Sequence, residues 1–399
     1  MKTTGLNWVT SVFSPPRYSE SVTAKPARNP IAGPRTIFFG LLLVVSTPGF
    51  ADHFPAKLYL QASNLPGRTY ADLAPAKTVR ALPEYPREKV DPGILRQAKD
   101  FLGNGHAFSL ILMQDGQIVF EGYANDAGAA SKLLTMSASK SMTSLAIGEA
   151  LCAGKIRDLD EIAQSYAPSL RDTAYGRSSV ANLLKMASGA LDPGDSDGVH
   201  SYEDLGRMTK GELTILDLIR KYGSQHSIFG SPVKAGERYA YNNLDTEALG
   251  KVIEEATGIS LPRWFEVTVW QKAGAEAPAR WQSDHKGSAI AAYGMNLITR
   301  DFARIGQYAM DQLSGRAGDG CMAAYLKAAG SKKISRQSRI TPAYGYQFPV
   351  DVNGKPWMYG HGGQMIGMNP ETGKLLVTMG YRGAFGAAHS LFNDWALKP

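Results

Sequence analysis

The chain has 399 residues, 44% of them hydrophobic and 20% charged, a composition that excludes a disordered or low-complexity protein and allows a sizeable core. The formal net charge is +7, but without residues 1–51 the chain holds 38 basic against 35 acidic residues. Because this excess is small and no Lys/Arg-rich run occurs, the charge does not indicate a nucleic-acid-binding surface.

The first 51 residues have the pattern of a targeting segment. Two arginines precede the apolar run 37–45, and Ala51 ends a small-residue pattern suited to cleavage before Asp52. Nine apolar residues are too few to span a bilayer. We therefore predict a signal peptide at 1–51 and an exported protein, periplasmic or secreted, without stable membrane insertion after cleavage. A short anchor or buried strand is the alternative, and the long stretch before the apolar run leaves the true start open.

The elements ahead of the chain's centre are an arm, a helix and a hairpin. Residues 52–95 are rich in Pro and Ala and are predicted to form an extended arm over the surface. Asp91 as a cap and Pro92 at the first helical position predict a helix that ends near Phe101. A β-hairpin with an Asp-Gly turn is predicted next, with the arms and turn 108–113, Asp115-Gly116 and 117–123.

The segment 137–153 predicts a buried helix. Its only charged residues are Lys140 and Glu149, and Gly154 follows as a stop signal. Ser137 and Lys140 lie one turn apart on the same face of such a helix. A buried lysine without a function is rare, so this pair is a candidate for chemistry.

The chemistry that suits this pair is nucleophilic catalysis. At the helix N-terminus, Ser137 would lie beside free N–H groups and the positive end of the dipole, which favour a developing alkoxide. If Lys140 is desolvated, its pKa would fall from about 10.4 towards neutrality, and it could accept the serine proton. The same spacing recurs in two other places, Ser231/Lys234 and Ser283/Lys286, but neither pair opens an apolar helix.

Residues from 155 to about 330 are mostly helical in pattern, and strands return after 335. The predicted helices are 159–166, 180–186, 214–221, 246–256, 261–267, 299–312 and 386–397, and 189–210 is a predicted loop. The predicted strands are 343–350, 355–359, 364–368 and 375–381. Strands at both ends of a helical middle predict an α+β fold, in which one domain at 96–399 contains an inserted helical lobe at about 155–330.

Cys152 and Cys321 are the two cysteines of the chain. In an exported protein they could pair, but Cys152 falls in the predicted central helix, so we favour a buried free thiol and leave pairing open. The seven histidines show no spacing typical of metal ligands. No metal and no organic cofactor is predicted.

A second candidate motif is Tyr241-Asn242-Asn243. A Tyr and an Asn two positions apart before a helix can both point into one cleft, and a tyrosine near a lysine can relay its proton to a leaving group. The alternative interpretation is a core aromatic residue with a capping asparagine.

A third candidate motif is His361-Gly362-Gly363. The two glycines would let the backbone approach a ligand closely, and the N–H of Gln364 could then be an oxyanion donor. The alternative is a glycine-rich bulge with an incidental histidine.

These motifs, in the order Ser-x-x-Lys, Tyr-x-Asn and His-x-Gly, resemble those of the serine β-lactamase and penicillin-binding-protein superfamily, on its class C side. Four further segments resemble the 6-aminohexanoate-dimer hydrolase and esterase branch: 109–123, 183–189, 299–306 and 344–381. The resemblance covers roughly residues 95–395. It implies a β-lactamase/transpeptidase-like fold, an antiparallel sheet flanked by helices with an all-helical lobe and the active site between them.

The resemblance also implies roles for individual residues. Ser137 would be the acylated nucleophile, with Lys140 and Tyr241 as the proton-transfer pair. Asn243 would orient the substrate or the lysine. The oxyanion hole would consist of the backbone N–H groups of Ser137 and Gln364, beside Gly363. His361 takes the place of a lysine found in many β-lactamases, and a largely neutral histidine suits the carboxylate of a β-lactam less well.

We therefore expect a serine hydrolase that cleaves small amides, short oligoamides or short-chain esters through an acyl-enzyme, with a small-molecule substrate and no nucleic acid as partner. A β-lactamase or a D-amino-acid-specific peptidase of the same fold is the alternative, and a non-catalytic ligand-binding domain is a second. A Gly-x-Ser-x-Gly match at 194–198 lacks the preceding buried strand that an α/β-hydrolase requires. The substrate's identity and the oligomeric state stay open.

Overall fold

The described part of the chain excludes the N-terminal segment and several shorter stretches. The computed structural model describes residues 59–60, 62–64, 68–104, 107–190, 204, 207–208, 210–223, 234–318 and 320–398. All of them fall within one compact unit, Gly40–Pro399. The predicted signal peptide at 1–51, the pentapeptide at 194–198 and Ser231 lie outside the described residues.

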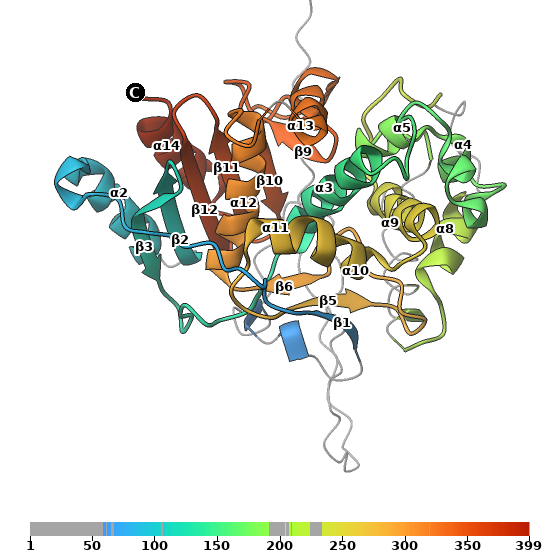
Figure 1. The fold of residues 1–399 in the computed structure, drawn as a ribbon, viewed down its shortest axis with the longest axis horizontal. Coiled ribbons are helices and arrows are strands. Elements are labelled where there is room, and N and C mark those ends of the chain that lie inside the picture. Colours follow the sequence, from blue (N-terminus) through green and yellow to red (C-terminus); the bar gives the residue numbers. More distant parts are fainter. Residues whose placement is uncertain are drawn as a thin grey trace, which may run out of the picture. The chain divides into compact units, whose positions relative to one another are not determined.

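A five-stranded antiparallel sheet joins the two ends of the described chain (Figure 1). Its strand order is β10-β11-β12-β2-β3, with the bounds β2 Ala107–Gln114, β3 Gln117–Tyr123, β10 Trp357–Gly360, β11 Gln364–Asn369 and β12 Lys374–Gly380. The predicted hairpin is confirmed, because Asp115 and Gly116 form its turn with φ of 49° and 81°. β12 pairs with β2, with Val377 opposite Ile111. The expected sheet of strands from both ends of the chain is therefore present.

Helices cover both faces of this sheet (Figure 1). Because side chains alternate along a strand, Leu110 and Leu112 face α2 (Pro92–Gly103) and α14 (Phe385–Ala396), whereas Ile111 and Met113 belong to the core on the other face. The helix α12 (Thr299–Leu313) packs on that second face, against β11, β12 and β2. Burial on both faces explains why β2 is an almost uninterrupted apolar run.

Two smaller sheets were not predicted. One has the order β1-β5-β6-β4, with β1 Thr69–Leu73, β4 Leu133–Leu134, β5 Ala279–Ser283 and β6 Met295–Leu297. The other consists of β7 Ile334–Ser335, β8 Ala343–Gly345 and β9 Phe348–Val350. The prediction of one strand at 343–350 was wrong, because Tyr346 and Gln347 adopt positive φ and turn the chain back. The arm at 52–95 is also more than a surface segment, since β1 pairs along its whole length with β5.

The central helix α3 (Ser139–Cys152) is buried from Ser139 to Ala150, as predicted, and packs against α9, α10 and α13. The other helices of the described chain are α4 Ala174–Arg177, α5 Val180–Leu184, α8 Ile215–Gly223, α9 Asn243–Thr257, α10 Leu261–Phe265, α11 Gln271–Ala273 and α13 Cys321–Ser331. A π-helical segment, Glu266–Trp270, joins α10 to α11, and short 3-10 turns occur at Ala62–Asn64, Arg87–Lys89 and Pro168–Leu170. The predicted helix at 159–166 was wrong, since only the 3-10 turn Ala163–Ser165 forms there, and α13 was not predicted.

None of the helices in the described residues combines the length and the apolar character needed to cross a bilayer.

A disulfide bond joins Cys152 at the end of α3 to Cys321 at the start of α13, with 5.6 Å between the Cα atoms. The favoured prediction of a buried free thiol was therefore wrong. The reason is that α13 packs along α3, with Ser144 Oγ and Tyr325 OH 2.7 Å apart, and so brings its first residue next to the last residue of α3. Cys152 is half-buried and Cys321 is exposed.

Candidate active site

Ser137 lies in the 3-10 turn Met136–Ala138, directly before α3 begins. Met136 has a φ of 49°, a left-handed conformation that is unusual for a residue other than glycine and is typical of functional turns. Ser139 holds this turn in place, because its Oγ lies 2.7 Å from Thr135 Oγ1 and accepts from the N–H of Met295 at 3.2 Å. The predicted position of Ser137 at the helix N-terminus is confirmed.

The structure brings Ser137, Lys140 and Tyr241 together. Lys140 Nζ donates to Ser137 Oγ at 3.0 Å, and Tyr241 OH donates to the same oxygen at 2.8 Å. Lys140 Nζ also lies 4.9 Å from the centre of the Tyr241 ring. Lys140 is only 1% exposed, so water does not compete for these contacts. A hydroxyl oxygen that accepts from two such donors is stabilised when it gains negative charge.

A second anchor of Lys140 is the carbonyl oxygen of Ala292, which accepts from Nζ at 3.0 Å. The N–H of Ala292 donates to Glu247 Oε1 at 3.1 Å, and the N–H of Ala291 donates to Glu247 Oε2 at 2.9 Å. Burial raises the pKa of Glu247 to about 7, although these N–H groups and Lys140 favour its charged form. Sequence reasoning missed Glu247; the available signal was an acid placed directly before the apolar Ala248 and Leu249 of a predicted helix.

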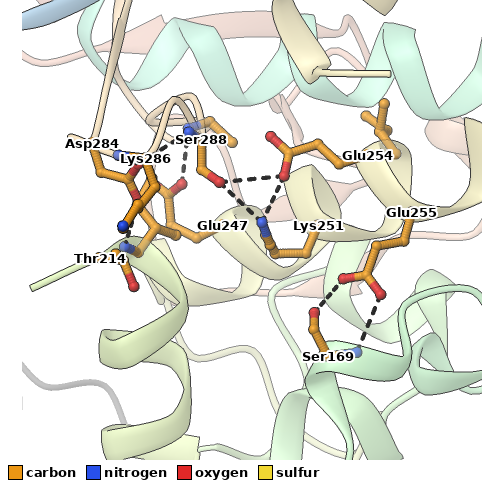
Figure 2. Close-up of polar contacts among 12 residues, drawn as sticks. Ser169, Thr214, Glu247, Lys251, Glu254, Glu255, Asp284, Lys286 and Ser288 are labelled. Atoms are coloured by element: carbon orange, nitrogen blue, oxygen red, sulfur yellow. Dashed lines mark hydrogen bonds and ion pairs between the residues drawn. The ribbon is translucent and has the colours of Figure 1, made fainter. Parts of the chain in front are cut away.

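Polar contacts fasten the segment before Ala291 to α9. Figure 2 shows Lys251 of α9 between Glu254 and Ser288. Its Nζ donates to Glu254 Oε2 at 2.7 Å and to Ser288 Oγ at 2.9 Å. This segment contains a turn at residues 284–288. Asp284 closes the turn, because its Oδ1 accepts from the N–H of Ser288 at 3.0 Å. Lys251 holds this turn against α9, and Glu247 of the same helix holds the N–H groups of Ala291 and Ala292, which follow the turn. The carbonyl of Ala292 therefore has a defined position. Lys286 lies in this turn, and the pair Ser283/Lys286 does not open a helix.

The two asparagines before α9 have different partners. Asn242 caps the helix, because its Oδ1 accepts from the N–H of Leu244 at 2.9 Å and its Nδ2 donates to Tyr175 OH at 3.2 Å. Asn243 lines a cavity with Ser137, and its buried Oδ1 has no hydrogen-bond partner within the described part of the chain. The capping alternative therefore applies to Asn242, and the side chain of Asn243 is available to a ligand.

The end of β10 lies directly against the turn that carries Ser137. A Cβ atom on Gly360 would come within 2.2 Å of the carbonyl oxygen of Thr135, so this approach requires glycine. His361, the next residue, lines the cavity, and its buried Nε2 has no partner among the residues that the structure describes. Burial lowers the pKa of His361 from 6.5, so the ring is neutral at pH 7.

The proposed oxyanion residues lie at the turn from β10 to β11. Gly362 and Gly363 have φ of 85° and 103°, which only glycine adopts easily. Gln364 begins β11, and its Oε1 accepts from the N–H of Gly380 at 2.8 Å. Neither Gly363 nor Gln364 is among the residues that line the cavity, so their role in an oxyanion hole stays a prediction.

The cavity in front of Ser137 has a volume of about 320 Å³. Besides the predicted residues, aromatic and apolar side chains and one arginine line it: Tyr239, Tyr344, Pro349, Tyr359, Phe385 and Arg336. Sequence reasoning missed these six, although Tyr239 and Tyr359 each lie two residues before a predicted site residue, Tyr241 and His361. Within the described ranges, no cluster of three or more His, Cys, Asp or Glu side chains is arranged to hold a metal ion.

Comparison with known families agrees with this geometry. The model of the family described as Beta-lactamase matches residues 100–382. The chain belongs to the Beta-lactamase family. The predicted membership of the serine β-lactamase and penicillin-binding-protein superfamily, and the predicted fold class, are thereby confirmed. A relative within this superfamily is a 6-aminohexanoate-dimer hydrolase of Paenarthrobacter ureafaciens, 23% identical over 287 residues, which are 68% of this chain and 71% of that protein.

Solved structures of this superfamily share the fold. A Bacillus anthracis protein, provisionally named a 6-aminohexanoate-dimer hydrolase, superposes with a TM-score of 0.65 at 19% identity, over 86% of this chain and 93% of that one. A D-stereospecific amidohydrolase from Streptomyces sp. superposes with a TM-score of 0.58 at 16% identity, over 78% of this chain and all of that one. This Beta-lactamase family member is therefore related to hydrolases in its fold.

Proposed function

We propose that this protein is a serine hydrolase that cleaves amide or ester bonds of small substrates through an acyl-enzyme on Ser137. The observation that carries the proposal is the position of Ser137 Oγ, 3.0 Å from Lys140 Nζ and 2.8 Å from Tyr241 OH at the wall of a cavity. The relationship to a 6-aminohexanoate-dimer hydrolase supports the reaction class.

In the proposed acylation step, Ser137 Oγ attacks the carbonyl carbon and its proton passes to Lys140. As the scissile bond breaks, Tyr241 donates its own proton to the leaving amine or alcohol and recovers one from Lys140. Lys140 and Tyr241 therefore end the step in the protonation states in which they began it. Water then attacks the acyl-enzyme while the same groups act in reverse. The contacts of Lys140 with Ala292 support this role, because they keep Nζ in reach of both oxygens.

The remaining predicted residues would bind the substrate and the developing oxyanion. Asn243 and His361 have buried polar atoms without partners among the described residues, and both line the cavity. We propose the N–H groups of Ser137 and Gln364 as the oxyanion donors, with Gly363 allowing the close approach. A neutral His361 would bind the carboxylate of a β-lactam less strongly than a fixed ammonium at this position would.

We propose also that the protein is exported. The bond between Cys152 and Cys321 supports this, because disulfides persist mainly in oxidising compartments. The test is cell fractionation with N-terminal sequencing of the mature chain. A mature chain that begins near Asp52 in an extracytoplasmic fraction would agree, and a full-length cytoplasmic chain with two free thiols would contradict it.

The test of the nucleophile is the intact mass of the protein after exposure to a fluorophosphonate and, separately, to penicillin. We expect one fluorophosphonate adduct in the wild type, none in Ser137→Ala, slower labelling in Lys140→Ala, and wild-type labelling in the control Ser331→Ala, which changes an exposed serine of α13. A stable penicillin adduct would favour a penicillin-binding peptidase. A folded wild type that forms no adduct with either reagent would rule out the acyl-enzyme.

A further inference from the structure

Tyr59 is a buried tyrosine of the arm that precedes β1. Its side chain is only 3% exposed, and its hydroxyl oxygen has no hydrogen-bond partner among the residues that the structure describes. Burial raises the pKa of Tyr59 well above its usual value of 10.0, so the phenol is uncharged. A buried hydroxyl without a partner is costly, so the position of this phenol requires a reason.

The hydroxyl of Tyr59 packs against Gly362-Gly363, the turn between β10 and β11, here called the glycine turn. A Cβ atom on Gly362 would come within 2.9 Å of this hydroxyl oxygen and within 3.1 Å of the carbonyl oxygen of Gly380. The phenol therefore fills part of the space that a side chain at position 362 would need. The ring centre of Tyr59 also lies 6.2 Å from that of Phe108, within the core.

The glycine turn has little rigidity of its own. Gly362 and Gly363 both have positive φ, and glycine is the residue with the greatest conformational freedom. The carbonyl of Gly362 accepts from the N–H of Gly383 at 3.1 Å, and the N–H of Gly363 donates to the carbonyl of Gly360 at 3.3 Å. Both distances are at the long end of the hydrogen-bond range, so the shape of the turn depends also on what packs against it.

The arm that carries Tyr59 is itself fastened to the sheet of β1 and β5. The carbonyl of Ala62 accepts from the hydroxyl of Tyr70 at 2.8 Å, and the carbonyl of Ser63 accepts from Nη1 of Arg280 at 3.1 Å. Tyr70 lies on β1 and Arg280 on β5, two strands that pair with each other. These contacts keep the phenol in place against the glycine turn.

We propose that Tyr59 is a positioning residue of the active site, whose phenol holds the glycine turn and so places His361 at the cavity and the N–H of Gln364 at the developing oxyanion. His361 and Gln364 directly flank the two glycines. Tyr59 lies ahead of residues 100–382, which the family model matches, so membership of the Beta-lactamase family assigns it no role. This inference rests on the proposed function, because the glycine turn belongs to the proposed oxyanion hole.

The test is a double-mutant cycle between Tyr59 and Gly362 in the full-length protein. Tyr59→Phe, Gly362→Ala and the double variant are compared with the wild type in kcat and KM for p-nitrophenyl butyrate and in the rate of fluorophosphonate labelling. The strain of an alanine at a φ of 85° is the same in both backgrounds, but the new Cβ meets the phenol oxygen only when Tyr59 is present. We therefore expect the loss of kcat caused by Gly362→Ala to be at least about threefold smaller in the Tyr59→Phe background.

Tyr59→Ala removes the ring as well and leaves the glycine turn unsupported. We expect kcat to fall by about tenfold with KM within about threefold of the wild type, because oxyanion contacts act mainly in the transition state. The control is Tyr166→Phe, which removes another buried hydroxyl, one that accepts from the N–H groups of Arg157 and Asp158; it should keep the wild-type kcat.

Two results would overturn the inference. One is a cycle in which the effects of Tyr59→Phe and Gly362→Ala on kcat and on labelling simply multiply, and the other is a folded Tyr59→Ala protein with the wild-type kcat. If the wild type cleaves no ester and Ser137 takes no fluorophosphonate, the proposed function fails first. If Ser137 is labelled but the cycle shows no coupling, only this inference fails.

Discussion

Glu247 and Lys140 bind opposite sides of the same residue, Ala292, whose N–H donates to the carboxylate while its carbonyl accepts from the ammonium. A buried acid on α9 thereby holds the backbone group that holds the lysine. Because Lys140 must stay within reach of both Ser137 and Tyr241, the position of Ala292 bears directly on the proposed proton transfer.

Replacing Glu247 should therefore slow the reaction without weakening substrate binding. In Glu247→Gln the amide oxygen can accept from one of the two N–H groups, but the NH₂ group would face the other donor. We expect kcat to fall by about tenfold, with KM within about threefold of the wild type. The matched control is Glu254→Gln, which changes an acid of the same helix that bonds Lys251. A folded Glu247→Gln protein with wild-type kcat would contradict the positioning role.

Tyr241→Phe removes the phenol oxygen that lies 2.8 Å from Ser137 and keeps the ring beside Lys140. We expect kcat for ester hydrolysis to fall by about 10²- to 10⁴-fold, the range for loss of a general acid or base. The control is Tyr123→Phe, because Tyr123 lies on β3 and bonds Glu121. If turnover and fluorophosphonate labelling both proceed at the wild-type rate, Tyr241 takes no part in proton transfer.

Gly360→Ala should disturb the turn that carries Ser137. The new Cβ would approach the carbonyl oxygen of Thr135 to 2.2 Å, so either β10 or the turn must move. We expect the free energy of unfolding in urea to fall by about 1–3 kcal/mol, and esterase activity to fall with it. Gly330→Ala is the control, because nothing lies within 4 Å of the position its Cβ would take. Wild-type stability and activity in Gly360→Ala would contradict the close approach.

Loss of the disulfide should destabilise the protein. The bond links residues separated by 169 positions, so it restricts the unfolded chain strongly. We expect Cys152→Ser/Cys321→Ser to lower the free energy of unfolding by about 2–4 kcal/mol. Dithiothreitol should lower the Tm of the wild type and leave that of the double variant unchanged. Detection of two free thiols in the native protein would contradict the bond.

His389 should make stability depend on pH in the acid range. Its ring lies 3.9 Å from that of Trp357, and burial lowers its pKa to about 4 from 6.5. Between pH 4 and pH 6.5 the folded state therefore binds fewer protons than the unfolded state. The contribution of neutral His389 to the free energy of unfolding is complete above pH 6.5 and is lost as the pH falls towards 4. The loss should be on the order of 2 kcal/mol at pH 4.5.

The measurement for His389 is urea unfolding at pH 7 and pH 4.5. His389→Phe keeps an aromatic ring against Trp357 and cannot be protonated, so its stability should change less between the two pH values than that of the wild type. Equal changes in both proteins would show that His389 does not contribute to the acid sensitivity.

Local patterns in the sequence predicted several elements and the order of the candidate motifs. Asp91 caps α2, with its Oδ1 accepting from the N–H of Gly93 at 2.7 Å, and Asp115-Gly116 forms the hairpin turn. Ser137 and Lys140 meet because they are one helical turn apart, and the apolar residues around them predict a buried helix. Capping, turn geometry and helical spacing act between residues close in the chain, so the sequence alone determines them.

Other features depend on contacts between distant segments, and only the tertiary structure decided them. The strands β4 and β6 have two and three residues, too few to show a periodic pattern, and they form because β6 pairs with β4 on one side and with β5 on the other. The pairing of Cys152 with Cys321 depends on how α13 packs on α3. The contact of Glu247 with Ala292 and the entry of Arg336 into the cavity likewise arise from packing between segments far apart in the chain, which no local spacing encodes.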